Sequence, residues 1–277
     1  MQALLLVGLA LVTSASAVKL GVGYHEEVGI PLAEKFRVLE EKNLAEQVQN
    51  RIVGGYLAPA NSPPYFAGLM IDIVSLTNDY NSVCGSTLVS ANRLVTAAHC
   101  WWDRQQFFTG GTRIATTDFV LHPQYNVKFH NHIAMIRLPT NVAFSISTQS
   151  LFQLVFNCSC LTFAGSWAVV AGYGSTSDQQ TETSTAVSHV DVHVVNEIDC
   201  VGIYGPDFVI HSTICTSGIG RVGPCSGDSG GPLVFHRSET PVLIGVASSV
   251  HPAGCQFGLP AVYARVTSFN NFILQNL

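Results

Sequence analysis

The chain has 277 residues, with 13 Lys and Arg against 18 Asp and Glu and a formal net charge of −5 at pH 7. An acidic balance argues against a nucleic-acid-binding surface, and no apolar run approaches the roughly 20 residues that a membrane-spanning helix requires. We therefore expect neither nucleic acid nor a membrane among the partners of this protein.

Residues 1–17 predict a secretory signal peptide. An apolar run from Ala3 to Val12 is followed by the small residues Ala15-Ser16-Ala17, and no acidic residue occurs before Glu26. This pattern is typical of a signal that is cleaved after its small residues. We expect a secreted, extracellular protein, in which the eight cysteines favour disulfide bonds over free thiols.

Residues 18–51 predict a charged activation propeptide. They hold six of the acidic and five of the basic residues in 34 positions, and helix-forming residues with a rough apolar stripe extend from Leu32 to Val48. The segment ends at Arg51, where the sequence changes to a long region poor in charge. We interpret this boundary as a processing site rather than a linker between two domains.

Residues 52–277 predict an all-β region, long enough for one large unit or two packed barrels. Short runs rich in Val, Ile and Thr recur between turn residues. The segment from Val266 to Leu277 is the part expected to be helical. The expected strands are Tyr65–Val74, Gly85–Val89, Arg93–Ala97, Ile133–Leu138, Trp167–Tyr173, Val187–Val195, Pro232–Phe235 and Val242–Ala247.

Four short motifs follow one another in this region. In their order and spacing they resemble chymotrypsin-like serine proteases, and the resemblance covers Arg51 to Leu277. It implies two packed six-stranded antiparallel β-barrels with a C-terminal helix across the back. His99 and His132 would lie on the first barrel and Ser229 on the second, with the substrate cleft between them. The motifs are Arg51-Ile52-Val53-Gly54-Gly55, Thr96-Ala97-Ala98-His99-Cys100, Gly227-Asp228-Ser229-Gly230-Gly231-Pro232 and Pro260-Ala261-Val262-Tyr263-Ala264-Arg265-Val266.

The resemblance implies that Ser229 is the nucleophile and His99 its base. A serine hydroxyl is a poor nucleophile at neutral pH, so an imidazole must accept its proton as the attack begins and return it to the leaving amine. The backbone N–H groups of Gly227 and Ser229 would form the oxyanion hole. We expect proteins or peptides as substrates or ligands, and no cofactor or metal ion.

The residue expected to orient His99 departs from the family pattern. His132 stands in His130-Asn131-His132-Ile133, where these proteases have an Asp. Replacing that Asp by Asn lowers turnover about 10,000-fold in such an enzyme. A neutral His132 can accept a hydrogen bond from His99 but supplies no negative charge, and a protonated His132 would repel the imidazolium. Proteolysis is therefore predicted to be strongly reduced or absent, and any residual activity to rise with pH.

Several interpretations of His132 stay open at this point. The first, which we favour, is a serine protease homologue that acts by binding, as a decoy or cofactor for other proteases. The second is a weak but genuine endopeptidase working at alkaline pH, for which the excess of Arg over Lys after residue 51 is a hint. The third is a sequence error, since Asp and His codons differ by one base. A zinc site formed by His99, His132 and His130 is a less favoured alternative.

The resemblance also implies a switch and its trigger. Cutting after Arg51 would free the ammonium group of Ile52, which would bury itself and pair with the carboxylate of Asp228. Such a buried pair can shape the oxyanion hole and the pocket. The side chain of Arg51 implies a trypsin-like activating protease that acts in trans.

The pocket for the side chain before the cut bond is expected to be neutral and apolar. The resemblance places Gly223, six positions before Ser229, at the pocket floor, so no carboxylate there selects Arg or Lys. Ser248 and Val250 would form one wall and Ala261 the other. The bulk of Val250 and Ala261 favours small or medium apolar side chains over Phe and Tyr.

Three disulfides and one modification site complete the expectations. Cys158 and Cys160 are separated by one residue, so a labile disulfide, free thiols and an intermolecular link stay open. Asn157 begins an Asn-Cys-Ser glycosylation acceptor. We expect a monomer, with protease inhibitors among its potential partners. The disulfides that the resemblance implies are Cys84–Cys100, Cys200–Cys215 and Cys225–Cys255.

Overall fold

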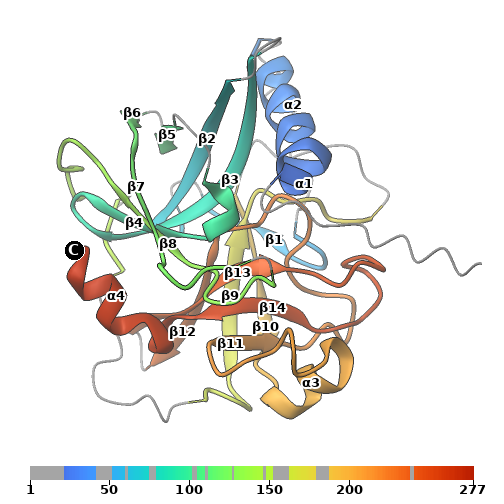
Figure 1. The fold of residues 1–277 in the computed structure, drawn as a ribbon. Coiled ribbons are helices and arrows are strands. Elements are labelled where there is room, and N and C mark those ends of the chain that lie inside the picture. Colours follow the sequence, from blue (N-terminus) through green and yellow to red (C-terminus); the bar gives the residue numbers. More distant parts are fainter. Residues whose placement is uncertain are drawn as a thin grey trace, which may run out of the picture.

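The computed structural model of the chain describes residues 22–41, 52–59, 62–74, 79–101, 105–109, 112–126, 128–145, 148–151, 162–178, 187–237 and 240–277. Two antiparallel β-sheets account for most of this fold, one at the upper left and one at the lower centre of Figure 1. The expected signal peptide, Arg51, Asn157, Cys158 and Cys160 lie outside the described residues.

The first sheet closes into a barrel. Its strand order is β6-β5-β2-β3-β4-β8-β7, so β6 and β7 stand at opposite ends of the sheet. These two strands are nevertheless consecutive in the chain and are separated by Thr117 alone. The two edges of the sheet are therefore joined, and the sheet forms a closed barrel. The strands are β2 (Phe66–Val74), β3 (Asp79–Ser90), β4 (Arg93–Thr96), β5 (Gln105–Thr109), β6 (Thr112–Thr116), β7 (Asp118–Leu121) and β8 (Ala134–Arg137).

The second sheet closes in a similar way. Its order is β1-β10-β9-β12-β13-β14-β11. An isolated antiparallel bridge between Val194 and Thr216 joins the end of β10 to β11, which stands at the far edge of that order. The strands are β1 (Tyr56–Leu57), β9 (Trp167–Gly172), β10 (Ser188–His193), β11 (Thr213–Thr216), β12 (Pro232–Arg237), β13 (Thr240–Ser249) and β14 (Ala261–Arg265).

Each barrel has its own apolar interior, because alternate residues of a strand share one face. Leu94 and Met135 are buried in the first barrel, and Leu233 and Ile244 in the second. Burying one such side chain stabilises the folded chain by roughly 1.5–3 kcal/mol. The two interiors therefore stabilise the two barrels separately, and the residues expected to be catalytic lie where the barrels meet.

The C-terminal segment connects the two barrels. It forms the 3₁₀ helix η3 (Val266–Phe269) and the α-helix α4 (Asn270–Gln275), which confirms the predicted helical end. Phe269 and Ile273 pack into the core of the first barrel, although β14 just before them belongs to the second. A further helix, α3 (Glu197–Tyr204), lies against the second barrel at the lower right of Figure 1 and was not predicted.

The described part of the predicted propeptide is helical. It contains α1 (Val22–Tyr24), the π-helical stretch η1 (His25–Gly29) and α2 (Ile30–Glu41), and it packs along β3 of the first barrel (Figure 1). The helix was expected from Leu32 onward, but it already begins at Val22. Residues 42–48, which complete the predicted helix, lie outside the described residues.

The two-barrel prediction is confirmed, with one difference in the strand count. Each sheet has seven strands rather than six. In the first sheet one strand is interrupted at Thr117 and counts as β6 and β7. In the second sheet the additional strand is the two-residue β1, which pairs with β10. All eight strands expected from the sequence are present.

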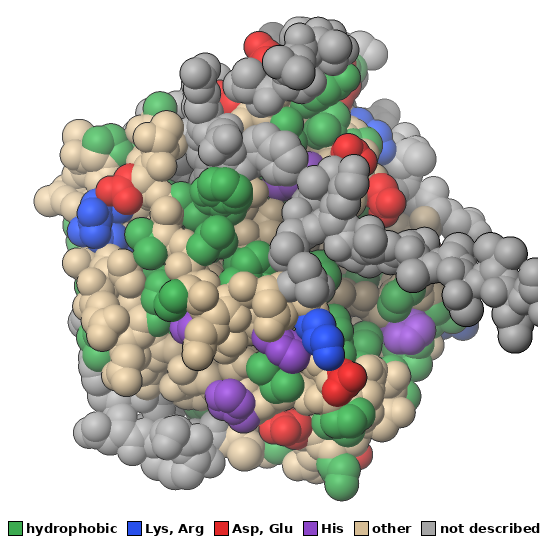
Figure 2. All heavy atoms as spheres, viewed as in Figure 1, with side chains coloured by type: hydrophobic (Ala, Val, Ile, Leu, Met, Phe, Trp, Pro, Cys, Tyr) green, Lys and Arg blue, Asp and Glu red, His purple; other side chains and the backbone are tan. Residues whose placement is uncertain are grey.

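Charge is sparse on the described surface. On the face shown in Figure 2, the Lys and Arg side chains are few and separated from one another. Among the described residues, no helix is long and apolar enough to cross a membrane.

The second core predicts a clear difference between two leucines. Leu233 is fully buried, whereas Leu274 on α4 is 40% exposed. Leu233→Ala should lower the free energy of unfolding by about 2–5 kcal/mol, because it leaves a cavity in a closed barrel. Leu274→Ala is the matched control and should cost less than about 1 kcal/mol. Urea denaturation measures both, and equal losses would contradict this account of the core.

Candidate active site

The expected nucleophile and base meet where the two barrels touch. The backbone N–H of Gly85 on β3 donates to the carbonyl of Ser229 at 2.7 Å. A side chain at Gly85 would bring a Cβ within 2.9 Å of the Gly231 backbone, and one at Gly230 would bring a Cβ within 2.3 Å of the Gly85 carbonyl oxygen. The glycines of both barrels are therefore required for this backbone contact, which brings Ser229 towards His99, the expected catalytic base on the first barrel.

His99 lies in the short 3₁₀ helix η2 (Ala98–Cys100) that follows β4. The disulfide between Cys84 and Cys100 fixes the position of η2 by linking it to β3, with Cα atoms 6.2 Å apart. The imidazole is 4% exposed. Burial lowers the pKa of His99 well below its ordinary value, so the imidazole is neutral at pH 7.

His132 contacts His99 where an orienting carboxylate was expected. Its Nε2 atom lies 2.8 Å from Nδ1 of His99 and also accepts the backbone N–H of His99 at 3.2 Å. A backbone N–H can only donate, so Nε2 of His132 carries no proton. The proton of the ring-to-ring hydrogen bond therefore belongs to Nδ1 of His99. In a neutral imidazole this leaves Nε2 of His99 unprotonated, which is the tautomer that a general base needs.

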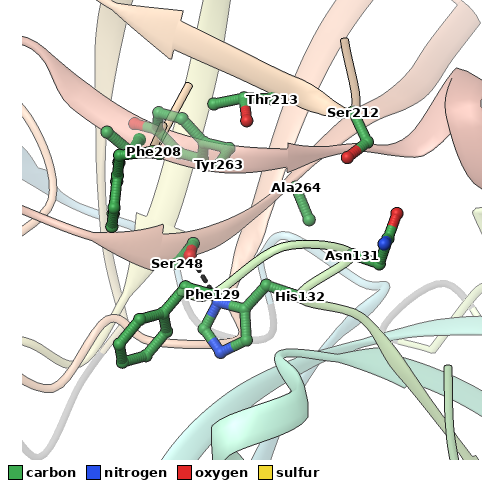
Figure 3. A pocket seen from close by; sticks show the side chains of 10 residues that line it. Phe129, Asn131, His132, Phe208, Ser212, Thr213, Ser248, Tyr263 and Ala264 are labelled. Atoms are coloured by element: carbon green, nitrogen blue, oxygen red, sulfur yellow. Dashed lines mark hydrogen bonds between the residues drawn. The ribbon is translucent and has the colours of Figure 1, made fainter. Parts of the chain in front are cut away.

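The rest of His132 is held just as firmly. Its Nδ1 lies within hydrogen-bond distance of the Ser248 hydroxyl, and since Nε2 is the acceptor, Nδ1–H donates. The Tyr125 ring stacks on the imidazole at 5.2 Å, and the Phe129 ring meets it edge-on at 4.9 Å. Figure 3 shows His132, Ser248 and Phe129 lining one pocket. Burial lowers the pKa of His132 to about 3, so this side chain orients His99 as a neutral group.

The third ligand that a zinc site needs is turned away from these two rings. His130 places Nε2 2.6 Å from the backbone carbonyl of Asp207, and because a carbonyl only accepts, that nitrogen carries a proton. The short His99–His132 distance is a hydrogen bond. The geometry therefore gives the zinc alternative no support.

Asp228 is buried beside the nucleophile with a carboxylate that accepts two backbone hydrogen bonds. Gly174 donates at 2.7 Å and Cys225 at 2.9 Å. A Cβ at Gly172 or Gly174 would lie 2.0 or 2.5 Å from the nearest carboxyl atom, so only glycines fit against this group. Burial raises the pKa of Asp228 to about 7, and the two hydrogen bonds oppose that shift.

The start of the protease-like region is inserted in the second barrel. Ile52 is fully buried in the second core. Val53 pairs with Gly223, whose N–H donates to the Val53 carbonyl at 3.2 Å. Ile52 has a φ of 76°, which a β-branched residue rarely adopts. The expected pocket floor at Gly223 is thus connected directly to the residue that follows Ile52.

A hollow beside Ser229 corresponds to part of the expected specificity pocket. Ser248 and Val250 line it, as expected from the sequence. Gly223 and Ala261 are not among its lining residues. Ala261 is buried in the second core, and its neighbour Val262 borders the hollow instead.

The three disulfides join the pairs that the resemblance implied. They are Cys84–Cys100, Cys200–Cys215 and Cys225–Cys255. The last of them places Cys225 in the wall of the hollow beside Ser229. The disulfides therefore fix the helix that carries His99, link α3 to β11 and fix one wall of the hollow beside Ser229.

Two residues of the predicted propeptide also reach the site, and they were not predicted from the sequence. Tyr24 places its ring 4.5 Å from the ring of His99, and the side chain of Ser229 hydrogen-bonds to its hydroxyl. His25 lies 3.1 Å from the backbone carbonyl of His99. Neither residue belongs to a recognisable motif, so no local pattern in the sequence marks them.

Comparisons with known proteins identify the family of this domain. The family model described as Trypsin matches residues 52–273. The chain is similar to Serine protease 1 of Drosophila melanogaster, with 33% identity over 83% of this chain and 87% of that protein. Collagenase of Hypoderma lineatum is 31% identical over 84% of this chain and 90% of that protein. The solved structure titled HL collagenase has a TM-score of 0.73 and 30% identity, and the match covers 81% of this chain and 98% of that one. The chain therefore belongs to the trypsin family of serine proteases.

Proposed function

We propose that the chain is a secreted zymogen of a chymotrypsin-like serine endopeptidase whose proteolytic rate is strongly reduced by His132. The observation that carries the proposal is the hydrogen bond between His99 and His132, which keeps His99 in the tautomer of a base. In the cut enzyme, Ser229 attacks the peptide carbonyl while Nε2 of His99 takes its proton. The N–H groups of Gly227 and Ser229 stabilise the oxyanion that forms.

What His132 lacks is negative charge. When His99 takes the proton it becomes an imidazolium, and a neutral neighbour does not stabilise that charge. Replacing the orienting Asp by Asn costs about 10,000-fold, or about 5.5 kcal/mol, and that change also leaves the base in the wrong tautomer. His132 keeps His99 in the correct tautomer, so only the loss of negative charge lowers the rate. We therefore expect a loss smaller than about 10,000-fold relative to a chain with Asp at this position.

Activation and specificity follow from the same site. Cutting after Arg51 by a trypsin-like protease would free the ammonium group of Ile52, which would neutralise the buried carboxylate of Asp228. A hollow with Val250 and Val262 in its wall favours small or medium apolar side chains. Export is supported by the disulfides, which persist in oxidising compartments. We expect the cut form to be a monomer that meets protein substrates and protease inhibitors.

Binding without catalysis is the second candidate. One observation favours it, namely that the cleft already holds a folded, helical piece of protein in contact with His99 and Ser229. A domain that retains this cleft but not a competent triad would act as a decoy or cofactor for other proteases. Turnover measurements separate the two candidates.

Restoring the carboxylate should restore turnover. After extended trypsin treatment and removal of trypsin, His132→Asp should cleave peptides with Ala or Leu before the cut bond 10- to 10,000-fold faster than the natural chain. Asn131→Asp adds the same charge one residue away and should leave the rate unchanged, while Ser229→Ala should abolish it. Turnover in His132→Asp alone would leave binding as the natural role. If neither chain hydrolyses any peptide, the proposed catalytic site is wrong.

The pH profile should distinguish the two side chains at position 132. A base works in its neutral form, so kcat/KM rises with pH through the pKa of His99. In the natural chain the buried His132 is neutral and does not stabilise the imidazolium, so the midpoint of this rise should lie at low pH. In His132→Asp the carboxylate stabilises the imidazolium, raises this pKa and shifts the midpoint to higher pH. A midpoint that stays the same or moves down would contradict the assigned roles.

A further inference from the structure

The predicted propeptide contacts both the expected nucleophile and its expected base. The hydroxyl of Tyr24 donates to the backbone carbonyl of Val83 at 2.8 Å and is itself the hydrogen-bond partner of the Ser229 side chain. Nε2 of His99 is buried and has no hydrogen-bond partner among the described residues. The Ser229 side chain is therefore hydrogen-bonded to Tyr24 and not to His99, and the Tyr24 ring lies against the imidazole.

His25 anchors this contact from the side of the base. Its Nε2 lies 3.1 Å from the carbonyl of His99, and its Nδ1 lies 2.7 Å from the hydroxyl of Ser82. Because the carbonyl only accepts, Nε2 carries the proton and Nδ1 accepts from Ser82. His25 is 1% exposed, and burial lowers its pKa to about 4, so it docks as a neutral side chain. Its two ring nitrogens both have partners on the protease-like domain.

The helix α2 packs beside the same site. Leu32 and Ala33 form a buried cluster with Val83 on β3. Leu32 also packs against the expected oxyanion loop, where a Cβ at Gly227 would lie 2.7 Å from Leu32 Cδ2. Phe36 meets Tyr173 edge-on, with ring centroids 5.9 Å apart. The contacts of the propeptide thus reach the base, the nucleophile and a glycine of the oxyanion hole.

The docked segment does not present a cleavable bond to Ser229. Tyr24 ends the short helix α1, and the group of this residue that Ser229 contacts is a phenol hydroxyl. A phenol offers no carbonyl carbon for nucleophilic attack and no leaving amine. The segment therefore has the contacts of a ligand of the catalytic groups without the chemistry of a substrate.

We propose that residues 22–41 are a built-in inhibitor that stays bound in the cleft after the chain is cut at Arg51. Activity then requires a second event, the destruction of the docked helix. Lys35 and Arg37 are trypsin sites within α2, and the Arg37 side chain is 54% exposed, so the activating protease can reach it. The role as inhibitor rests on the proposed proteolytic function, whereas the retention of the cut propeptide is a binding property that needs no catalysis.

The first experiment measures retention in the full-length protein. In a chain with Lys35→Gln, Arg37→Gln and Lys42→Gln, limited trypsin treatment cuts at Arg51 but leaves the helix whole. The propeptide should co-elute with the domain in native size-exclusion chromatography. Adding Tyr24→Ala and His25→Ala should release it, whereas Glu27→Ala, an exposed position on the same helical stretch, should not. The proposal would be overturned if the cut propeptide with Tyr24 and His25 intact separated from the domain at once. It would also be overturned if the propeptide with both alanines stayed bound.

The second experiment measures inhibition and uses His132→Asp to supply turnover. The chain with the uncleavable helix should be at least tenfold slower than the same chain whose helix trypsin can destroy. A synthetic peptide of residues 22–41, added to the fully activated domain, should restore inhibition, and the peptide with Tyr24→Ala and His25→Ala should not. Equal rates with and without the helix would overturn the inhibitory role. Retention without any turnover in His132→Asp would support docking and count against the proposed catalysis.

Discussion

The site depends on a backbone contact between two closed barrels. Each barrel is stabilised by its own apolar interior, and neither contains both catalytic side chains. They meet because Gly85 on one side and the Gly230-Gly231 pair on the other have no Cβ atoms, so that Gly85 can donate directly to the carbonyl of Ser229. A methyl group at these positions would push the barrels apart, and separation by even about 1 Å at a reacting centre is costly for catalysis.

Two hydrogen bonds between His99 and His132 explain why a histidine can replace a carboxylate in geometry but not in charge. The backbone N–H of His99 fixes the proton of His132, and His132 in turn fixes the proton of His99. Orienting the His99 ring requires only a hydrogen-bond acceptor next to its Nδ1 atom. Stabilisation of an imidazolium requires a negative charge there, and a neutral ring does not provide it. Orientation and charge, which a single Asp would supply together, are separated in this chain.

Much of this was predictable, and the limits have physical reasons. Continuous apolar runs such as Val242 to Ala247 mark strands whose faces are both buried, and the Ser229 and His99 motifs mark the expected catalytic turns. Strands β5 and β6 carry polar residues among their apolar ones, so their period is weak, and α3 is too short to show an amphipathic pattern. The role of Tyr24 depends on contacts with residues far along the chain. No local pattern encodes such contacts, which is why the propeptide was predicted as a helix but not as an occupant of the cleft.

The buried carboxyl group of Asp228 makes the uncut chain sensitive to acidity. Its pKa of about 7 lies above the value of an exposed Asp, so the folded uncut chain binds this proton more tightly than the unfolded chain does. The folded uncut form is therefore favoured in acid and loses this stabilisation as the pH rises from about 4 to 7. In the proposed activation, a new ammonium group beside Asp228 would remove the penalty by pairing with the ionised form. The free energy gained by cutting would then be small at acidic pH and would grow as the pH rises towards neutral.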